Sequence, residues 1–78
     1  MKDFLIDKIE EIAFERVTLN DSLWEAKVLD SITIVEFAVE IENEYGIKIS
    51  FDEIVVDNFE TLDRLIPFIE KKIAEKNA

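Results

Sequence analysis

The apolar residues of positions 32–45 constrain the fold most strongly, because they recur at the spacing of an α-helix. At ~100° per residue, one set of side chains falls on a single side of that helix. This set consists of Ile34, Phe37, Ala38, Ile41 and Tyr45. Gly46 follows directly, and glycine is typical of the residue just past a helix C-terminus. The sequence therefore predicts a helix over residues 32–45.

Two more segments show the same period. The apolar positions are Leu5, Ile9, Ile12 and Ala13 in residues 3–14, and Leu62, Leu65, Ile66, Ile69 and Ile73 in residues 61–75. The chain of 78 residues has one glycine and one proline, too few turn signals for short strands joined by tight turns. We therefore expect an all-α fold in one domain, residues 1–78. It should be a small four-helix bundle of three longer helices and one short third helix, with a long loop between the first two helices.

Residues 47–56 and Pro67 are harder to assign. Ile47 and Ile49 alternate like a strand, whereas residues 52–56 have room for one or two helical turns. We interpret this stretch as a loop followed by the short third helix. Pro67 lies past the first turn of the last helix, where it removes a backbone hydrogen bond, so we expect a kink there.

The connection between the first two helices, residues 15–30, is long enough to suggest a functional role. It holds DSL at residues 21–23 and leads into DSI at residues 30–32. The first copy precedes a broken pattern and is interpreted as local loop structure. The second copy opens a helix, where Asp30 is a good N-cap and the free N–H groups of the first turn favour a negative group on Ser31. The alternative for Ser31 is a serine that only caps the helix.

The composition excludes several kinds of chemistry. The chain has no cysteine and no histidine, so disulfides, Ser-His and Cys-His nucleophile pairs and imidazole metal ligands are impossible. Acids are plentiful, but nothing singles out two of them as a catalytic pair. Asp52, Glu53 and Asp57 lack the spacing of a calcium loop. We expect neither enzymatic activity nor a metal site.

The net charge narrows the range of partners. With 19 acids against 9 bases the formal net charge is −10, which repels nucleic acids and anionic lipids. The opening MKDFLIDKIEEI mixes acids with apolar residues, unlike a signal or transit peptide, and no run approaches the ~18 apolar residues that span a bilayer. We expect a cytoplasmic monomer that binds neither nucleic acid nor membranes.

The helix over residues 32–45 carries a second apolar stripe, opposite the first and edged with acids. This stripe consists of Ile32, Val35, Glu36, Val39 and Asn43, flanked by Glu40 and Glu42. Small domains expose some aliphatic residues in any case. Aliphatic residues on an acidic face that begins one residue after Ser31 nevertheless favour a docking surface for basic partners.

Residues 29–49, LDSITIVEFAVEIENEYGIKI, resemble the signature of the acyl and peptidyl carrier proteins. The signature has Asp-Ser-aliphatic, a helix with Val-Glu soon after the serine, acidic residues, an aromatic residue and Gly-Ile-x-Ile. Residues 59–69, FETLDRLIPFI, look like the start of that family's last helix. Three positions depart from the family pattern: Ile32 replaces the common Leu or Met, Ser50 stands where many members have Pro, and Lys27 takes a loop position that is often glycine.

The resemblance implies that Ser31 is esterified with 4′-phosphopantetheine by a separate transferase that uses coenzyme A and magnesium. Asp30 matches the aspartate before the attachment serine, and Ile32, Glu36 and Val39 fall where the family places its partner-recognition helix. The reactive thiol then arrives on the cofactor, which suits a chain without cysteine. The protein would present acyl or aminoacyl thioesters to a loading (adenylating) enzyme and to downstream enzymes of fatty acid, polyketide, nonribosomal peptide or aminoacyl-transfer pathways. An acidic helical interaction module without a prosthetic group is the alternative.

Two features indicate the type of cargo. DSLWEAKVLDS, residues 21–31, is similar to the corresponding stretch of D-alanyl and other free-standing aminoacyl carrier proteins. We also expect a crowded core, filled by the aromatic residues Phe4, Phe14, Trp24, Phe37, Tyr45, Phe51, Phe59 and Phe68. Both features favour a short or polar cargo held outside the bundle.

Overall fold

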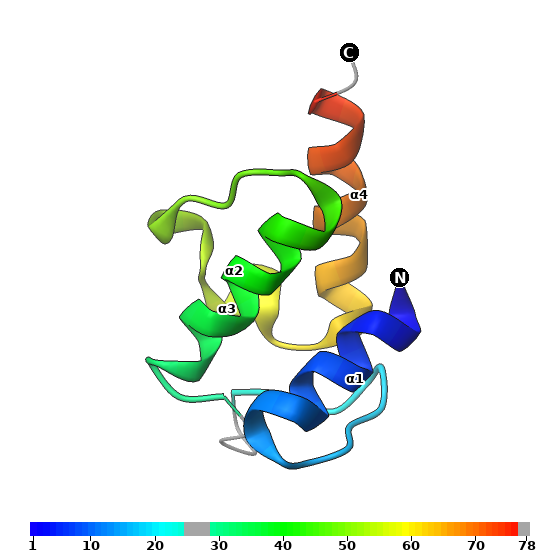
Figure 1. Cartoon of the computed structure of the whole chain (residues 1–78), viewed down its shortest axis with the longest axis vertical. Coiled ribbons are helices and arrows are strands. Elements are labelled where there is room, and N and C mark those ends of the chain that lie inside the picture. The colour runs from blue at the N-terminus through cyan, green and yellow to red at the C-terminus, as the bar shows by residue number, and fades with distance from the viewer. Residues whose placement is uncertain (25–28, 77–78) are drawn as a thin grey trace.

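The computed structural model describes residues 1–24 and 29–76, and within them the predicted all-α bundle is confirmed (Figure 1). Its elements are α1 (Lys2–Ala13), α2 (Thr33–Tyr45), the 3-10 helix η1 (Phe51–Glu53), α3 (Val56–Phe59) and α4 (Leu62–Lys76). The α1 helix packs on α2, α3 packs on α4, and α1 also contacts α4. The last turns of α4 extend beyond the other helices toward the C-terminus (Figure 1). The departure noted at Lys27 lies outside the described residues.

The three longer helices begin and end close to the predicted residues. The short third helix begins later in the chain than predicted, at Val56 instead of at the start of residues 52–56. Residues 52–56 do not form one helix, because η1 ends at Glu53 and α3 begins at Val56. Between them Val55 is extended, with φ −129° and ψ 162°. The side chain of Asn58 donates to the Glu53 carbonyl at 2.9 Å, so a contact from beyond the break satisfies that carbonyl.

The core is built mainly from branched aliphatic side chains, and the expectation of a crowded aromatic core was wrong. The apolar stripes of α1, α2 and α4 meet there as predicted. The fully buried large side chains are Leu5, Ile9, Leu23, Phe37, Ile41, Phe59, Leu62, Leu65 and Ile69. Phe14 and Phe51 are instead 88% and 82% exposed, and Trp24 is 37% exposed. Phe14 follows the last residue of α1 in a left-handed conformation, so the chain turns away from the core there.

The connection between α1 and α2 is anchored to the start of α4. Leu23 N donates to Glu60 O at 2.7 Å, and Asp63 N donates to Leu19 O at 3.0 Å. Leu23 is fully buried. These bonds hold residues 19–23 of the connection against the bundle, so this part of the predicted loop packs on the fold.

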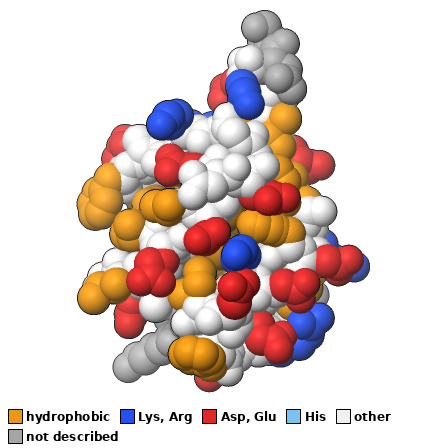
Figure 2. Space-filling view, in the orientation of Figure 1, with side chains coloured by type: hydrophobic (Ala, Val, Ile, Leu, Met, Phe, Trp, Pro, Cys, Tyr) orange, Lys and Arg blue, Asp and Glu red, His pale blue; other side chains and the backbone are white. Residues whose placement is uncertain are grey.

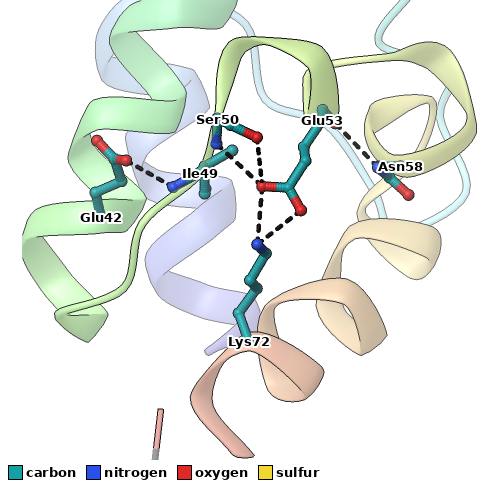
Figure 3. A network of polar contacts seen from close by, with 6 residues as sticks. All are labelled: Glu42, Ile49, Ser50, Glu53, Asn58 and Lys72. Carbon is teal, nitrogen blue, oxygen red and sulfur yellow. Dashed lines mark hydrogen bonds and ion pairs between the residues drawn. The ribbon is translucent and has the colours of Figure 1, made fainter. Parts of the chain in front are cut away.

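The connection between α2 and α3 is held in place by the hydrogen bonds and the ion pair drawn in Figure 3. Glu42 Oε2 accepts from Ile49 N at 2.7 Å, which fixes the chain just after α2. Ser50 donates to Glu53 Oε1 through its backbone N at 3.0 Å and through its hydroxyl at 2.9 Å. Lys72 of α4 donates to the same Oε1 at 2.8 Å and lies 2.7 Å from Oε2. A single carboxylate therefore closes η1 and joins it to α4.

Pro67 lies within α4, which is continuous from Leu62 to Lys76. Proline has no N–H, so the carbonyl of Asp63 loses its helical partner. Both Pro67 and Asp63 are exposed, so solvent can reach that carbonyl. The kink at Pro67 stays a prediction.

Candidate functional site

Asp30 forms the cap that starts α2, as predicted. Its Oδ1 accepts from Ile32 N at 2.9 Å, from Thr33 N at 2.8 Å and from Thr33 Oγ1 at 3.0 Å. Thr33 Oγ1 in turn accepts from Asp30 N at 2.8 Å. Ile34 N donates to Asp30 O at 3.0 Å, which is the helical i+4 pattern. The hydrogen bonds from Thr33 and Ile32 lower the pKa of Asp30, so its carboxylate stays ionised and acts only as an acceptor.

Ser31 lies in the turn that this cap creates, and its side chain is exposed. The capping bonds at the start of α2 go to Asp30, which weakens the alternative that Ser31 serves only as the cap. The N-terminal turn of a helix favours negative charge, because its N–H groups and dipole point toward it. A phosphate ester on Ser31 would therefore lie in a favourable electrostatic position.

The other Asp-Ser copy lies in a different environment. Asp21 Oδ2 accepts from Thr18 N at 2.8 Å, which closes a turn inside the connection. Ser22 is half-buried, and no regular helix begins in the described residues directly after it. The prediction that this copy forms local loop structure is confirmed.

A pocket of about 320 Å³ adjoins Ser31. It is lined by Trp24, Leu29, Asp30, Ser31 and Ile34. Trp24 and Leu29 were not predicted as site residues, since they belong to the connection and follow no helical period. Both lie in stretches that resemble carrier proteins, Leu29 directly before Asp30 and Trp24 within residues 21–31, but only the folded connection brings Trp24 next to the start of α2.

The second stripe of α2 is exposed, as predicted. Ile32 is 69% exposed, and Val35, Glu36, Val39 and Asn43 are also exposed. Glu40 differs, because it is half-buried and lies 3.5 Å from Lys8 Nζ of α1. Its charge is thus partly neutralised within the protein. Figure 2 shows apolar and acidic side chains interspersed over the visible face of the molecule.

Exposed apolar side chains continue beyond α2, which the sequence patterns did not predict. Val55 and Val56, at the start of α3, are exposed, as is Phe51 of η1. They fall in the stretch whose secondary structure was ambiguous, and the extended Val55 separates η1 from α3. The break between these two short elements leaves their apolar side chains at the surface.

The described residues, 1–24 and 29–76, contain neither a membrane-spanning helix nor a cluster of metal ligands. No helix in these ranges is long and apolar enough to cross a membrane. The same ranges contain no group of three or more acidic side chains arranged to hold a metal ion. The exposed Ser31 at the start of α2 and the pocket beside it form the candidate site.

Comparison with known proteins agrees with this geometry. A family model described as the phosphopantetheine attachment site matches residues 5–69. The D-alanyl carrier protein of Streptococcus sanguinis is 34% identical over 68 residues, covering 85% of this chain and 86% of that protein. The D-alanyl carrier proteins of Streptococcus equi subsp. zooepidemicus and subsp. equi are each 33% identical over 72 residues, covering 90% of this chain and 91% of theirs. These matches indicate a covalently attached 4′-phosphopantetheine and argue against an interaction module without a prosthetic group.

Proposed function

Because the chain belongs to the phosphopantetheine attachment family of carrier proteins, we propose that Ser31 is the residue that carries the group. The observation that carries this proposal is the exposed Ser31 in a turn held by Asp30, at the N-terminus of α2. Ser22 lacks that setting. We also propose that residues 1–78 form one carrier domain, since the family match extends from α1 into α4.

The residues near Ser31 have distinct roles in the modification. The Ser31 hydroxyl displaces 3′,5′-ADP from coenzyme A: a bond from Oγ to phosphorus forms, and the bond from phosphorus to the departing diphosphate oxygen breaks. The hydroxyl proton passes to a base on the transferase. Asp30 holds the turn through its bonds to Ile32 and Thr33, and the N-terminus of α2 favours the phosphodiester.

The bound group supplies the thiol that this cysteine-free chain lacks, and with it the capacity to form a thioester. Carrier proteins leave the reactions of the cargo to partner enzymes. For this chain we propose an aminoacyl cargo, with D-alanine as the first candidate. The support is the similarity to three D-alanyl carrier proteins over most of the chain.

The proposed docking face for partners is the second apolar stripe with its acidic edge, on α2 and the residue just before it. It comprises Ile32, Val35, Glu36, Val39, Glu40 and Asn43. Aliphatic side chains edged with carboxylates suit a partner surface that is apolar at its centre and basic at its rim. The partners would be the phosphopantetheinyl transferase, an adenylating enzyme that loads the amino acid, and an enzyme that accepts it downstream.

The experiment uses the two Asp-Ser copies as a matched pair. Wild type, Ser31→Ala and Ser22→Ala are incubated with coenzyme A, magnesium and a transferase of broad specificity, and their intact masses are measured. Wild type and Ser22→Ala should each gain one phosphopantetheine, while Ser31→Ala gains none and keeps its helicity, because Asp30 makes the cap. Modification of Ser31→Ala, or its loss in Ser22→Ala, would contradict the assignment.

The cargo is tested on the holo protein. It is incubated with ATP and a D-alanine-adenylating enzyme, and in parallel with enzymes that load other amino acids or fatty acids. Thioester formation is followed by intact mass. Efficient loading with D-alanine supports the proposed cargo, whereas loading only with a fatty acid rejects it and leaves the assignment of Ser31 intact.

A further inference from the structure

The pocket beside Ser31 has apolar walls and a polar edge. Trp24, Leu29 and Ile34 supply the apolar side chains, and Asp30 and Ser31 supply the polar ones. Pockets for small molecules combine a mainly apolar lining with a few polar groups and occupy roughly 300–1,000 Å³. At about 320 Å³ this pocket is near the lower limit, so it suits a short segment of a ligand better than a long acyl chain.

The walls of the pocket are held in place by the fold itself. Leu29 and Ile34 are buried, and Leu29 N donates to Leu23 O at 3.3 Å. Leu23 is fully buried and donates to Glu60 O at 2.7 Å, which places its neighbour Trp24 beside the pocket. Trp24 nevertheless remains 37% exposed. A site formed in advance loses less conformational entropy when a ligand enters.

The proposed attachment at Ser31 suggests what occupies the pocket, because it places the phosphopantetheine arm beside it. In 4′-phosphopantetheine a single methylene separates the phosphate from a quaternary carbon that carries two methyl groups. These methyl groups are the first apolar part of the arm, and the covalent bond keeps them close to the serine. We propose that the pocket binds this gem-dimethyl segment, with its methyl groups against the indole of Trp24 and the side chains of Leu29 and Ile34. The inference rests on the proposed function.

The tether makes even a weak contact effective, because binding of the attached arm is intramolecular. The thiol lies at the opposite end of the arm, so the thioester and its cargo stay outside the pocket. Trp24 and Leu29 belong to the connection between α1 and α2, whereas the proposed docking face lies on α2. The pocket would therefore direct the first part of the arm toward the connection while partners occupy α2.

The experiment uses Trp24, the only tryptophan of the chain. Holo protein is prepared with ¹³C-labelled methyl groups in the gem-dimethyl segment, and intact mass confirms one attached group. Methyl groups packed against an indole face should resonate upfield of the same groups in free coenzyme A. Conversion from apo to holo should also shift the Trp24 emission to shorter wavelength and reduce its quenching by acrylamide.

Three variants test whether the indole of Trp24 causes the upfield shift of the methyl resonances. Trp24→Leu keeps an apolar side chain without a ring and should lose the upfield shift, while Trp24→Phe should keep part of it. Phe51→Leu is the matched control, because Phe51 is an exposed aromatic residue that does not line the pocket. It should leave the shift unchanged. Circular dichroism confirms that each variant is folded.

The outcomes distinguish this inference from the proposed function. Methyl resonances of the holo wild type at the coenzyme A position would overturn the pocket assignment, as would an upfield shift that survives in Trp24→Leu. Loss of the shift in Phe51→Leu as well would also overturn it. Failure of the wild type to gain mass, or a gain in Ser31→Ala, would overturn the attachment at Ser31 and the pocket assignment with it.

Discussion

Phe14 and Gly46 have the same backbone conformation but differ in how well they suit it. Each follows the last residue of a helix with a left-handed backbone, at φ 61° and φ 63° respectively. Glycine adopts this region without steric cost, whereas a residue with a Cβ atom does not. An added Cβ at Gly46 would lie 2.6 Å from Lys76 Nζ, the far end of a flexible side chain that can shift at little cost, so the backbone conformation is the main constraint.

Exchanging these residue types should change stability in opposite directions. Gly46→Ala should lower the free energy of unfolding by about 1 kcal/mol, since the left-handed conformation costs an alanine roughly 1–2 kcal/mol. Phe14→Gly should raise it by about 0.5 kcal/mol, because relief of that strain is partly offset by a more flexible unfolded chain. Phe14 is so exposed that little burial is lost. Urea unfolding followed by circular dichroism measures both changes.

Lys76 provides the control for Gly46. In a Lys76→Ala background the contact with the added Cβ disappears, and we expect Gly46→Ala to cost about the same as in the wild type, because backbone strain accounts for the cost. An equal cost in both backgrounds would show that the lysine moves aside freely. A Phe14→Gly variant less stable than the wild type would contradict the role assigned to backbone strain.

At the scale of elements, the pair formed by Glu53 and Lys72 joins η1 to α4. The side chains are 28% and 23% exposed, so solvent screens the pair only partly. The hydrogen bonds from Lys72 and Ser50 lower the pKa of Glu53 from 4.5 to about 2. A pKa that is lower in the folded state means that the unfolded chain binds a proton first as the pH falls.

Lys72→Met should therefore destabilise the protein in a pH-dependent way. At neutral pH we expect a loss of about 0.5–1 kcal/mol, typical of a partly exposed ion pair. The stabilisation is fully present above pH 4.5 and is lost as the pH falls toward about 2. The difference between wild type and Lys72→Met should shrink over this range, as measured by urea unfolding at a series of pH values.

Lys71 supplies the control for this pair. It is the exposed neighbour of Lys72 on α4, so Lys71→Met removes the same charge without breaking the contact to Glu53. We expect a change within about 0.5 kcal/mol, as for most surface substitutions. If Lys71→Met cost as much as Lys72→Met, or if the Lys72→Met deficit were independent of pH, net charge would explain the effect better than the pair.

At the scale of the whole molecule, the net charge of −10 creates a field that attracts basic surfaces. The proposed docking face lies within this field. Glu36 is exposed on that face and takes part in no ion pair among the described residues, whereas Glu40 contacts Lys8. A substitution of Glu36 therefore breaks no ion pair within the described part of the protein. It can distinguish recognition of this face by a partner from the effect of the total charge.

Glu36→Lys should lower kcat/KM for modification by the transferase by about tenfold. This is the lower limit of the change in association rate that electrostatic steering typically produces. The wild-type rate should also fall as salt rises, because the screening length drops from about 10 Å at 0.1 M to about 3 Å at 1 M. Steady-state rates across this range measure both effects.

Glu70→Lys is the matched control for total charge. Glu70 is exposed on α4, away from the proposed docking face, and its reversal changes the net charge by the same amount. We expect a smaller effect than for Glu36→Lys. Equal slowing by the two variants would assign the attraction to net charge alone, and rates indifferent to both variants and to salt would contradict an electrostatic docking face.

Features that depend on neighbours along the chain could be predicted from the residue order alone. The helical periods placed α1, α2 and α4, Gly46 marked the end of α2, and Asp30 was identified as its cap. Each of these depends on residues within about one helical turn, so the local order of residue types is enough to predict it. The family signature around Ser31 is local in the same sense.

Features that join distant segments became visible only in the folded chain. Phe14 and Phe51 are as apolar as Phe37 and Phe59, yet only the last two are buried, because burial depends on how the helices and connections meet. The pairing of Glu53 with Lys72 spans 19 positions, and it stabilises η1 in the stretch where a loop followed by one short helix was predicted. The pocket beside Ser31 likewise forms where the connection folds back on α2. Such contacts depend on packing in three dimensions, which the periodicity of a single segment does not encode.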